Sequence, residues 1–270
     1  MLRLSAFSEA IAALGRGRDI AVKAYTLTDR LIHEIELRAK DGANVSVTME
    51  ADPSGSHPDQ LQRRNEHVAS KLRSCGVDAV LQRNVHTKTI AVDGTVFFDE
   101  SNWRDGDLIL SGAAGDAGNV ASLKSSALSD ESAMLDCARS EGTSGAIVET
   151  ETFDRFNVVS KALREMAERG MSPRLLVDGR ALRHNKKEAV SLAWIQRQGV
   201  DVRVCNDTEK FALAGNRAWL GSANATSAYG GHDMTDWGVV TEDSAIVAAV
   251  HDRLETRWAN ARELRPLVAV

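Results

Sequence analysis

The sequence has only three cysteines, no long apolar run and no excess of positive charge, and each of these shortages argues against a class of protein. Cys75, Cys137 and Cys205 are odd in number and widely spaced, so they suit neither a disulfide framework nor a close-spaced zinc site. We expect them to be small buried residues in a reducing compartment. No apolar run approaches the ~18 residues that a membrane-spanning helix needs, and the first residues turn polar too early for a secretory signal. We therefore expect a cytoplasmic protein without an integral membrane segment.

The formal net charge of −5 argues against a nucleic-acid coat protein, which would normally be basic. It leaves a nuclease open, because a local cationic pocket is enough to hold one phosphate. The densest basic segment, at residues 180–187, is best explained as a solvated loop and helix start. No group of His, Cys and carboxylate residues has metal-ligand spacing, so we expect neither a metal site nor another cofactor.

Strand and helix patterns alternate in the first half of the sequence. Residues 19–25 and 44–49 alternate apolar and polar side chains as strands do, and residues 29–40 carry a helical apolar stripe. A second helix is expected up to Gly76, followed by a strand at 77–81. A strand–turn–strand unit then completes this half.

The second half repeats this order. We expect strands at 145–150, 174–177 and 200–204, with helices at 157–169 and 186–198 between them. Another strand–turn–strand unit follows. The repetition indicates an internal duplication.

The duplication predicts an α/β fold in two halves. We expect an N-terminal half at residues 1–115, a connecting segment at 116–144 and a C-terminal half at 145–270. Because strands alternate with helices, each half is predicted to be a mainly parallel sheet flanked by helices.

Each strand–turn–strand unit has a lysine near its start and an asparagine fourteen positions later: Lys88 and Asn102 in the first, Lys210 and Asn224 in the second. In a strand, each lysine shares a face with the residue two positions before it. Exposed edge lysines would not require this constant distance to an asparagine. The constant spacing therefore indicates that the two lysines hold equivalent places in the two units.

The first unit reads His-x-Lys-x4-Asp from His86 to Asp93, with Asn102 after it, and this pattern resembles the signature of the phospholipase D superfamily. The second unit contains Gly-Ser-x-Asn-x-Thr at Gly221–Thr226, which also resembles that family. The similar order of elements extends over residues 5–262.

The resemblance implies two halves packed with pseudo-twofold symmetry around a single site. It implies metal-independent phosphodiester hydrolysis, or phosphatidyl or phosphoryl transfer, in which His86 attacks phosphorus and forms a phosphohistidine. Lys88 and Lys210 would neutralise the charge of the phosphate. Asn102 and Asn224 would donate hydrogen bonds to its oxygens.

Several acidic residues could support the imidazole. Asp93 completes the motif, but the Asp93-Gly94 pair between two apolar strands is a strong hairpin signal, so we expect a turn residue. Asp107 and Asp236 are better candidates for orienting a histidine, as an acid does in the family. Asp236, however, has no histidine in its own unit to orient.

The second unit departs from the family motif because Thr208 stands in place of its histidine. A threonine does not donate a proton as readily as an imidazole near neutral pH. Glu209, His232 or water would have to replace it. Ser222 is a weaker candidate for phosphate binding, and the first unit departs from the family by carrying Asp99-Glu100 at the matching place.

Three functions remain open from the sequence. The leading hypothesis is a phosphodiesterase that acts on a phospholipid head group or a nucleic acid, as a monomer with two fused halves. The alternative is a weak or inactive pseudoenzyme that serves as a phosphate-ester binding module. A symmetric dimer that brings two copies of His86 together is a third possibility.

Overall fold

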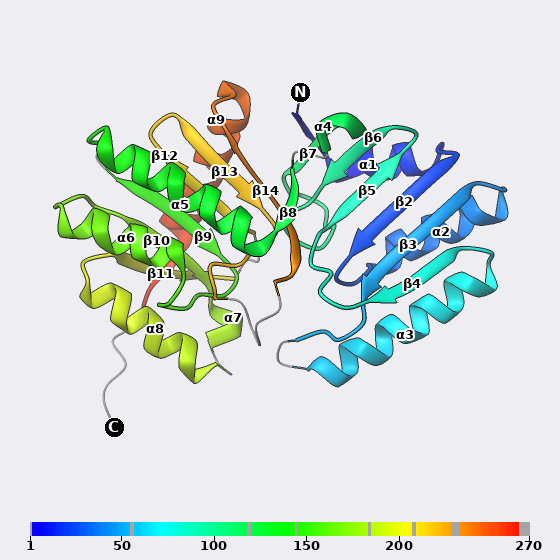
Figure 1. The fold of residues 1–270 in the computed structure, drawn as a ribbon, viewed down its shortest axis with the longest axis horizontal. Helices are drawn as coiled ribbons and strands as arrows, with labels where there is room; N and C mark the ends of the chain where they lie inside the picture. The colour runs from blue at the N-terminus through cyan, green and yellow to red at the C-terminus, as the bar shows by residue number, and fades with distance from the viewer. Residues whose placement is uncertain are drawn as a thin grey trace. The chain divides into compact units, whose positions relative to one another are not determined.

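The computed structural model describes residues 2–54, 57–117, 120–143, 145–182, 185–206, 209–227 and 233–264. It divides into two compact units, shown in Figure 1 by the blue-to-green and the green-to-red parts of the chain. The first unit comprises Met1–Leu123 and His232–Trp237, and the second comprises Lys124–Gly231 and Gly238–Val270. Each unit is therefore described by itself.

The first unit is a sheet with helices packed on it. Its strands are β1 (Arg3–Ser5), β2 (Asp19–Ala24), β3 (Asn44–Glu50), β4 (Asp78–Gln82), β5 (Thr89–Val92), β6 (Thr95–Phe98), β7 (Ile109–Ala113) and β8 (Ala121–Leu123). Its helices are α1 (Phe7–Leu14), α2 (Asp29–Lys40), α3 (Pro58–Ser74) and α4 (Ala114–Ala117). Seven strands form a sheet in the order β1-β7-β6-β5-β2-β3-β4.

The second unit has a closely similar plan. Its strands are β9 (Ala146–Thr150), β10 (Arg174–Asp178), β11 (Asp201–Cys205), β12 (Phe211–Ala214), β13 (Arg217–Gly221), β14 (Thr235–Thr241) and β15 (Arg262–Glu263). Its helices are α5 (Lys124–Ser140), α6 (Val158–Glu168), α7 (Gly179–Leu182), α8 (Lys186–Arg197) and α9 (Ser244–Asn260). The strands lie in the order β15-β11-β10-β9-β12-β13-β14. The start of β14 belongs to the first unit, where it pairs with β8.

The strand orders of the two units match. The order β7-β6-β5-β2-β3-β4 in the first corresponds to β14-β13-β12-β9-β10-β11 in the second, and each pair of neighbours has the same direction in both. The predicted α/β fold with two similar halves is confirmed.

The sheets are mixed, whereas the sequence predicted mainly parallel ones. In the described part of the first unit, β2, β3 and β4 run parallel, and the other paired strands of the sheet run antiparallel. The reason is the hairpin between β5 and β6, because a tight turn can join only antiparallel neighbours. Helix–strand alternation predicted only the parallel part.

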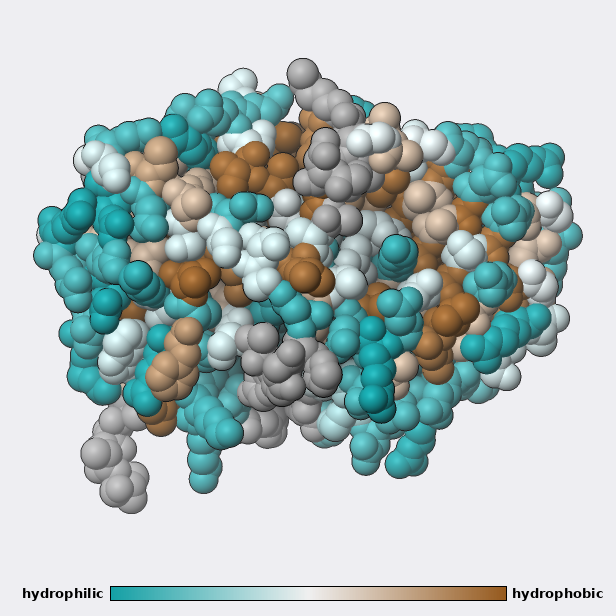
Figure 2. Space-filling model, in the orientation of Figure 1, coloured by the Kyte–Doolittle hydropathy of each residue, from teal (hydrophilic) through white to brown (hydrophobic). Residues whose placement is uncertain are grey.

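The helices form where an apolar stripe and a cap coincide. Helix α2 starts after Thr28, whose hydroxyl accepts a hydrogen bond from Leu31 N, and it buries Leu31, Ile32 and Ile35. In the second unit, Asn157 caps α6 through its side-chain oxygen. Hydrophilic side chains cover much of the visible surface (Figure 2). The stripes accordingly face the two apolar cores.

The segment that the sequence presented as a connection contains α5. This helix packs against α6, β12 and β13, and it buries Leu128, Met134 and Leu135 in the core of the second unit. Its small and polar residues masked the apolar stripe in the sequence. No helix in the described residues is both long and apolar enough to cross a membrane.

Candidate active site

The centre of the candidate site is a histidine held by an acid 150 positions away. His86 lies between β4 and β5, and its backbone N–H donates to the carbonyl of Thr235, at the start of β14. This contact brings Asp236 to the imidazole, with His86 Nδ1 2.7 Å from Asp236 Oδ1. Asp236 is fully buried, whereas the side chain of His86 is 13% exposed. Asp236, which follows the second strand–turn–strand unit in the sequence, thus orients His86 of the first strand–turn–strand unit.

This contact determines which imidazole nitrogen can react. A carboxylate can only accept a hydrogen bond, so Nδ1 of His86 carries the proton and Nε2 presents its lone pair. Lys88 Nζ lies 3.5 Å from that Nε2 and donates to the carbonyl oxygen of His86 at 3.1 Å. Lys88 is 2% exposed. The pair therefore combines a nucleophilic nitrogen with a buried positive charge, which suits an anionic phosphorus group.

Tyr25 is a further member of the site that the sequence analysis missed. It directly follows β2, and its ring meets the ring of His86 edge-on, with centroids 5.3 Å apart. Its hydroxyl donates to the carbonyl of Ser54 at 3.0 Å, which fixes the ring. Only the pairing of β2 with β5 brings Tyr25 to His86, so no local pattern could have identified it.

Three acids, two of them adjacent in the sequence, lie together after β6. One carboxylate oxygen from each of Asp99, Glu100 and Asp107 lies within 4.8 Å of the others. Asp99 Oδ2 accepts from Trp103 N at 2.6 Å, and burial raises the pKa of Asp99. A protonated member reduces the repulsion within such a cluster. The sequence analysis noted Asp99-Glu100 and Asp107 separately, but not that they lie together.

The role expected of Asp107, orienting an imidazole, stays a prediction. Asp107 Oδ2 accepts from Arg104 N at 2.6 Å, and Asp236 holds His86 instead. Asn102 lies half-buried in the loop that follows Asp99.

Asp93 lies in the β5–β6 turn, as the hairpin signal indicated. Its φ of 48° is in the left-handed region that such a turn requires. Its carboxylate accepts from Asp19 N at 2.9 Å and from Arg18 N at 3.0 Å, and these backbone hydrogen bonds lower its pKa. Asp93 lies at the opposite end of β5 from Lys88, so it secures the hairpin and does not contact the imidazole.

The second unit holds its own lysine in the same way. The carbonyl of Lys210 accepts from Gly221 N at 3.3 Å, just as that of Lys88 accepts from Asp99 N at 3.0 Å. Lys210 is 1% exposed, and its Nζ lies 3.5 Å from Glu151 Oε2. The sequence analysis missed Glu151, because it follows β9 and is remote from the motif.

Asn224 and Ser222 follow β13. Asn224 Oδ1 accepts from the hydroxyl of Thr150 at 3.5 Å, and that hydroxyl also accepts from Ala225 N at 3.0 Å. Ser222 is fully buried. The structure thus places the end of the Gly-Ser-x-Asn motif against the end of β9.

Glu209 is not suited to replace the missing histidine as a proton donor. It is 1% exposed and forms ion pairs with Arg253 and Arg257 of α9, including a contact of 2.6 Å from Arg253 Nε. Guanidinium groups thus contact both of its carboxylate oxygens. The other two positions, Thr208 and His232, lie outside the described residues.

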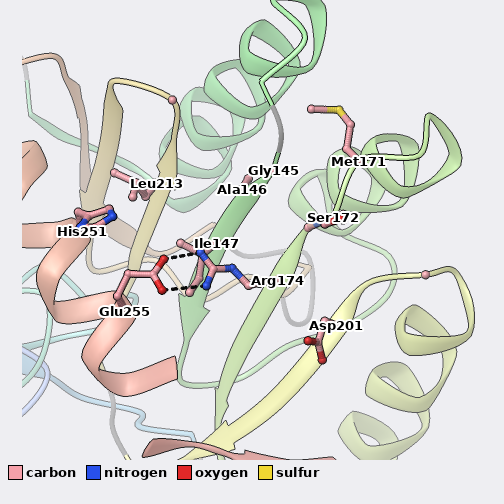
Figure 3. Close-up of a pocket in the computed structure, with 13 residues that line it drawn as sticks. Gly145, Ala146, Ile147, Met171, Ser172, Arg174, Asp201, Leu213, His251 and Glu255 are labelled. Carbon is pink, nitrogen blue, oxygen red and sulfur yellow. Dashed lines mark hydrogen bonds and ion pairs between the residues drawn. The ribbon is translucent and has the colours of Figure 1, made fainter. Parts of the chain in front are cut away.

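A cavity of about 550 Å³ in the second unit lies away from these residues. Figure 3 shows Arg174 and Glu255 paired across it, with His251 and Asp201 nearby. It is lined by the start of β9, whereas Lys210 and Glu151 lie beyond the end of that strand. This cavity is therefore separate from the motif residues.

Comparison with known proteins finds structures with a similar fold but no matching sequence family. No family model matches the chain, and no curated protein sequence matches it. Polyphosphate kinase from Porphyromonas gingivalis has a TM-score of 0.68 and 14% identity, over 96% of this chain and 47% of that chain. Phosphatidylserine synthase from Haemophilus influenzae has a TM-score of 0.62 and 10% identity, over 97% of this chain and 87% of that chain. The fold is phospholipase D-like.

At these identities the likeness concerns the phospholipase D-like fold alone. The chain spans about half of the polyphosphate kinase and most of the phosphatidylserine synthase, with 47% and 87% covered. Nuc from Salmonella typhimurium, a phospholipase D family member, aligns with 49% of this chain at a TM-score of 0.42. The resemblance expected from the motifs is confirmed at the level of the fold.

Proposed function

We propose that this protein catalyses phosphodiester hydrolysis or phosphoryl transfer through a phosphohistidine on His86. The observation that supports this most is the 2.7 Å contact between His86 Nδ1 and the buried Asp236, with Lys88 Nζ 3.5 Å from Nε2. A histidine needed only for packing would not require a buried carboxylate on one nitrogen and an ammonium group at the other. The names of the two matched enzymes, a kinase and a synthase of phosphorus compounds, are compatible with this chemistry.

In the first step, the lone pair of His86 Nε2 forms a bond to phosphorus while the bond to the leaving oxygen breaks. Asp236 stabilises the positive charge that develops on the ring, and Lys88 neutralises the equatorial oxygens. In the second step, water or an alcohol displaces the imidazole. This sequence of steps uses no metal ion, so we propose that activity persists in EDTA.

We propose that both halves serve a single phosphate. Lys210 would add a second positive charge, while Asn102 and Asn224 would donate to phosphate oxygens. A fused monomer provides both halves in one chain. The substrate would be a phosphodiester of a lipid head group or a nucleic acid. Cytoplasmic localisation stays a prediction from the sequence.

A second candidate is a phosphate-ester binding module. Two departures from the family motif favour it: Thr208 in place of a histidine, and the acidic Asp99-Glu100 pair in place of Gly-Ser near Lys88. Such a module would bind phosphodiesters without forming a covalent intermediate.

Mass spectrometry after incubation with a chromogenic phosphodiester distinguishes the two candidates. The enzyme would gain the mass of the phosphoryl ester on His86, and His86→Ala would abolish both this label and turnover. His251→Ala is the matched control, because His251 is an exposed histidine of α9. Substrate binding that leaves His86 unlabelled, with any turnover unchanged by His86→Ala, would favour the binding module.

A further inference from the structure

The loop that joins β9 to α6 in the second unit carries an exposed aromatic ring. Phe156 is 76% exposed, the largest exposure among the large apolar side chains that the structure describes. The guanidinium carbon of Arg155 lies 4.8 Å from the centre of this ring. The guanidinium group therefore stacks on one face of the ring, and the high exposure of Phe156 leaves room for a second planar group.

Hydrogen bonds hold this loop against the Gly-Ser-x-Asn-x-Thr motif of the same unit. Asp154 accepts from Phe156 N at 2.7 Å with one carboxylate oxygen and from Ser227 N at 2.6 Å with the other. The carbonyl of Ala225, a motif residue, accepts from Asn157 Nδ2 at 2.6 Å and from Asp154 N at 3.0 Å. A ring that is fixed before binding loses little conformational freedom when a ligand stacks on it.

Basic side chains flank the same loop. Phe153 N donates to Glu188 Oε1 at 2.9 Å, so the loop meets the first turn of α8. Lys186 and Lys187 directly precede Glu188, and both are exposed. They end the basic segment that the sequence analysis assigned to a solvated loop and helix start. Together with Arg155, they place three positive charges on the segments that carry the ring or touch its loop.

An aromatic ring among cations suits a chain of unpaired bases joined by phosphates. Bases stack on aromatic side chains, while lysine and arginine bind the phosphates. A lipid bilayer is a poorer match, because a ring that enters hydrocarbon would have to bring the Arg155 guanidinium with it or lose that contact. A nucleic-acid duplex is also a poorer match, because its bases already stack on one another.

We propose that Phe156 stacks on an unpaired base of a single-stranded nucleic acid, with Arg155, Lys186 and Lys187 at the phosphates. All four residues belong to the second unit. As a statement about substrate, this inference rests on the proposed function, because it narrows the phosphodiester to one of a nucleic acid. The binding itself requires no reaction at His86.

Equilibrium binding of short fluorescent oligo(dT) and oligo(rU), followed by anisotropy, tests the stacking. The His86→Ala protein is the parent, so that cleavage does not interfere. Phe156→Leu keeps an apolar side chain but removes the flat face, and it should weaken binding about 5–150-fold. Phe156→Trp should bind at least as tightly as the parent. Leu37→Ala, at an exposed apolar position of α2, is the control and should leave binding unchanged.

The salt dependence of binding tests the phosphate contacts separately. Each lost contact to a single strand lowers the slope of log K against log salt concentration by about 0.7, so Lys186→Ala/Lys187→Ala should lower it by about 1.4. Lys161→Ala should leave the slope unchanged, because Lys161 is an exposed lysine of α6 that pairs with Glu165. A preference for oligo(dT) or oligo(rU) would identify DNA or RNA as the ligand, and either supports the proposal.

Two results would overturn the proposal. One is a Phe156→Leu protein that binds both oligomers as tightly as its parent. The other is a parent that binds phosphatidylglycerol vesicles but neither oligomer, which would make this surface a membrane contact. The proposed function fails by a different result, an unlabelled His86 without turnover, and binding that depends on Phe156 would remain in that case.

Discussion

At the scale of single residues, the reactivity proposed for His86 depends on two neighbours of opposite charge. Asp236 holds Nδ1 at 2.7 Å from inside the protein, and Lys88 lies 3.5 Å from Nε2. In the proposed mechanism, the carboxylate fixes the tautomer, while the ammonium group attracts the anionic substrate to the attacking nitrogen. Each neighbour can be tested by a substitution.

Asp236→Asn should lower turnover by as much as about 10⁴-fold, the loss found when the orienting aspartate of a serine protease triad becomes asparagine. The amide can donate to Nδ1 and so favours the tautomer with its proton on Nε2, where no lone pair remains for attack. Single-turnover rates on a nitrophenyl ester measure the effect. Asp107→Asn should have a far smaller effect, because Asp107 accepts from Arg104 N. The reverse order of effects would contradict the assignment.

Because a second motif histidine is absent, the rate of cleavage should depend strongly on the leaving group. Proton donation to a leaving oxygen is typically worth about 10²–10⁴-fold, so nitrophenyl esters should be cleaved faster than alkyl esters by a factor of this size. Thr208→His should raise turnover of alkyl esters selectively. His232→Ala should harm alkyl esters alone if that histidine donates the proton. Comparable rates for both ester classes in the wild type would show that a proton donor is already in place.

At the scale of elements, α5 carries a buried carboxyl group that makes stability depend on pH. Burial raises the pKa of Glu131 to about 8, although the ordinary value is 4.5. The unfolded chain has lost this proton above pH 4.5, while the folded protein keeps it until about pH 8. The contribution of Glu131 to stability is therefore fully present below pH 4.5 and is lost as pH rises towards 8.

Glu131→Gln should remove this dependence, because an amide stays neutral at every pH. The variant should gain stability over the wild type by about 1.4 kcal/mol per pH unit between the two pKa values. Urea unfolding at pH 5, 6 and 7 measures the difference between the two proteins. Glu168→Gln on the exposed part of α6 is the control, and its difference from the wild type should stay constant. A constant difference for Glu131→Gln as well would contradict the buried, protonated state.

At the scale of the whole molecule, the duplicated strand order gives each unit a buried lysine at the same place in its sheet. Lys88 and Lys210 follow equivalent loops, and the carbonyl of each accepts from the residue that follows the second hairpin strand or ends it. The side chains near this lysine differ between the two units. One carries His86 and Tyr25, and the other carries Glu151.

If both lysines act on one phosphate, Lys88→Ala and Lys210→Ala should not be additive. Each single substitution should lower kcat/KM, and the double variant should lose less than the product of the two losses. We expect a coupling energy of about 0.5–3 kcal/mol. Steady-state kinetics of the four proteins, with a nitrophenyl phosphodiester, complete the cycle. Strictly additive losses would indicate that the two units act independently.

Local pattern was enough to determine many of the elements and the motif. The apolar stripe of residues 29–40, the Asp93-Gly94 turn and the spacing of each lysine to its asparagine are all short-range features of the sequence. A helix stripe and a turn depend on neighbours in the chain, so they can be inferred without the fold. The phospholipase D resemblance and the duplicated α/β plan followed from them.

Only the tertiary structure decided which side chains surround the imidazole. His86 and Asp236 are 150 positions apart, and Tyr25 reaches His86 through the pairing of β2 with β5. The acids that follow β6 and the partners of Glu209 were also hidden from sequence patterns. Such contacts depend on the order and register of strands, which arise from how the whole sheet packs and not from the residues beside each motif.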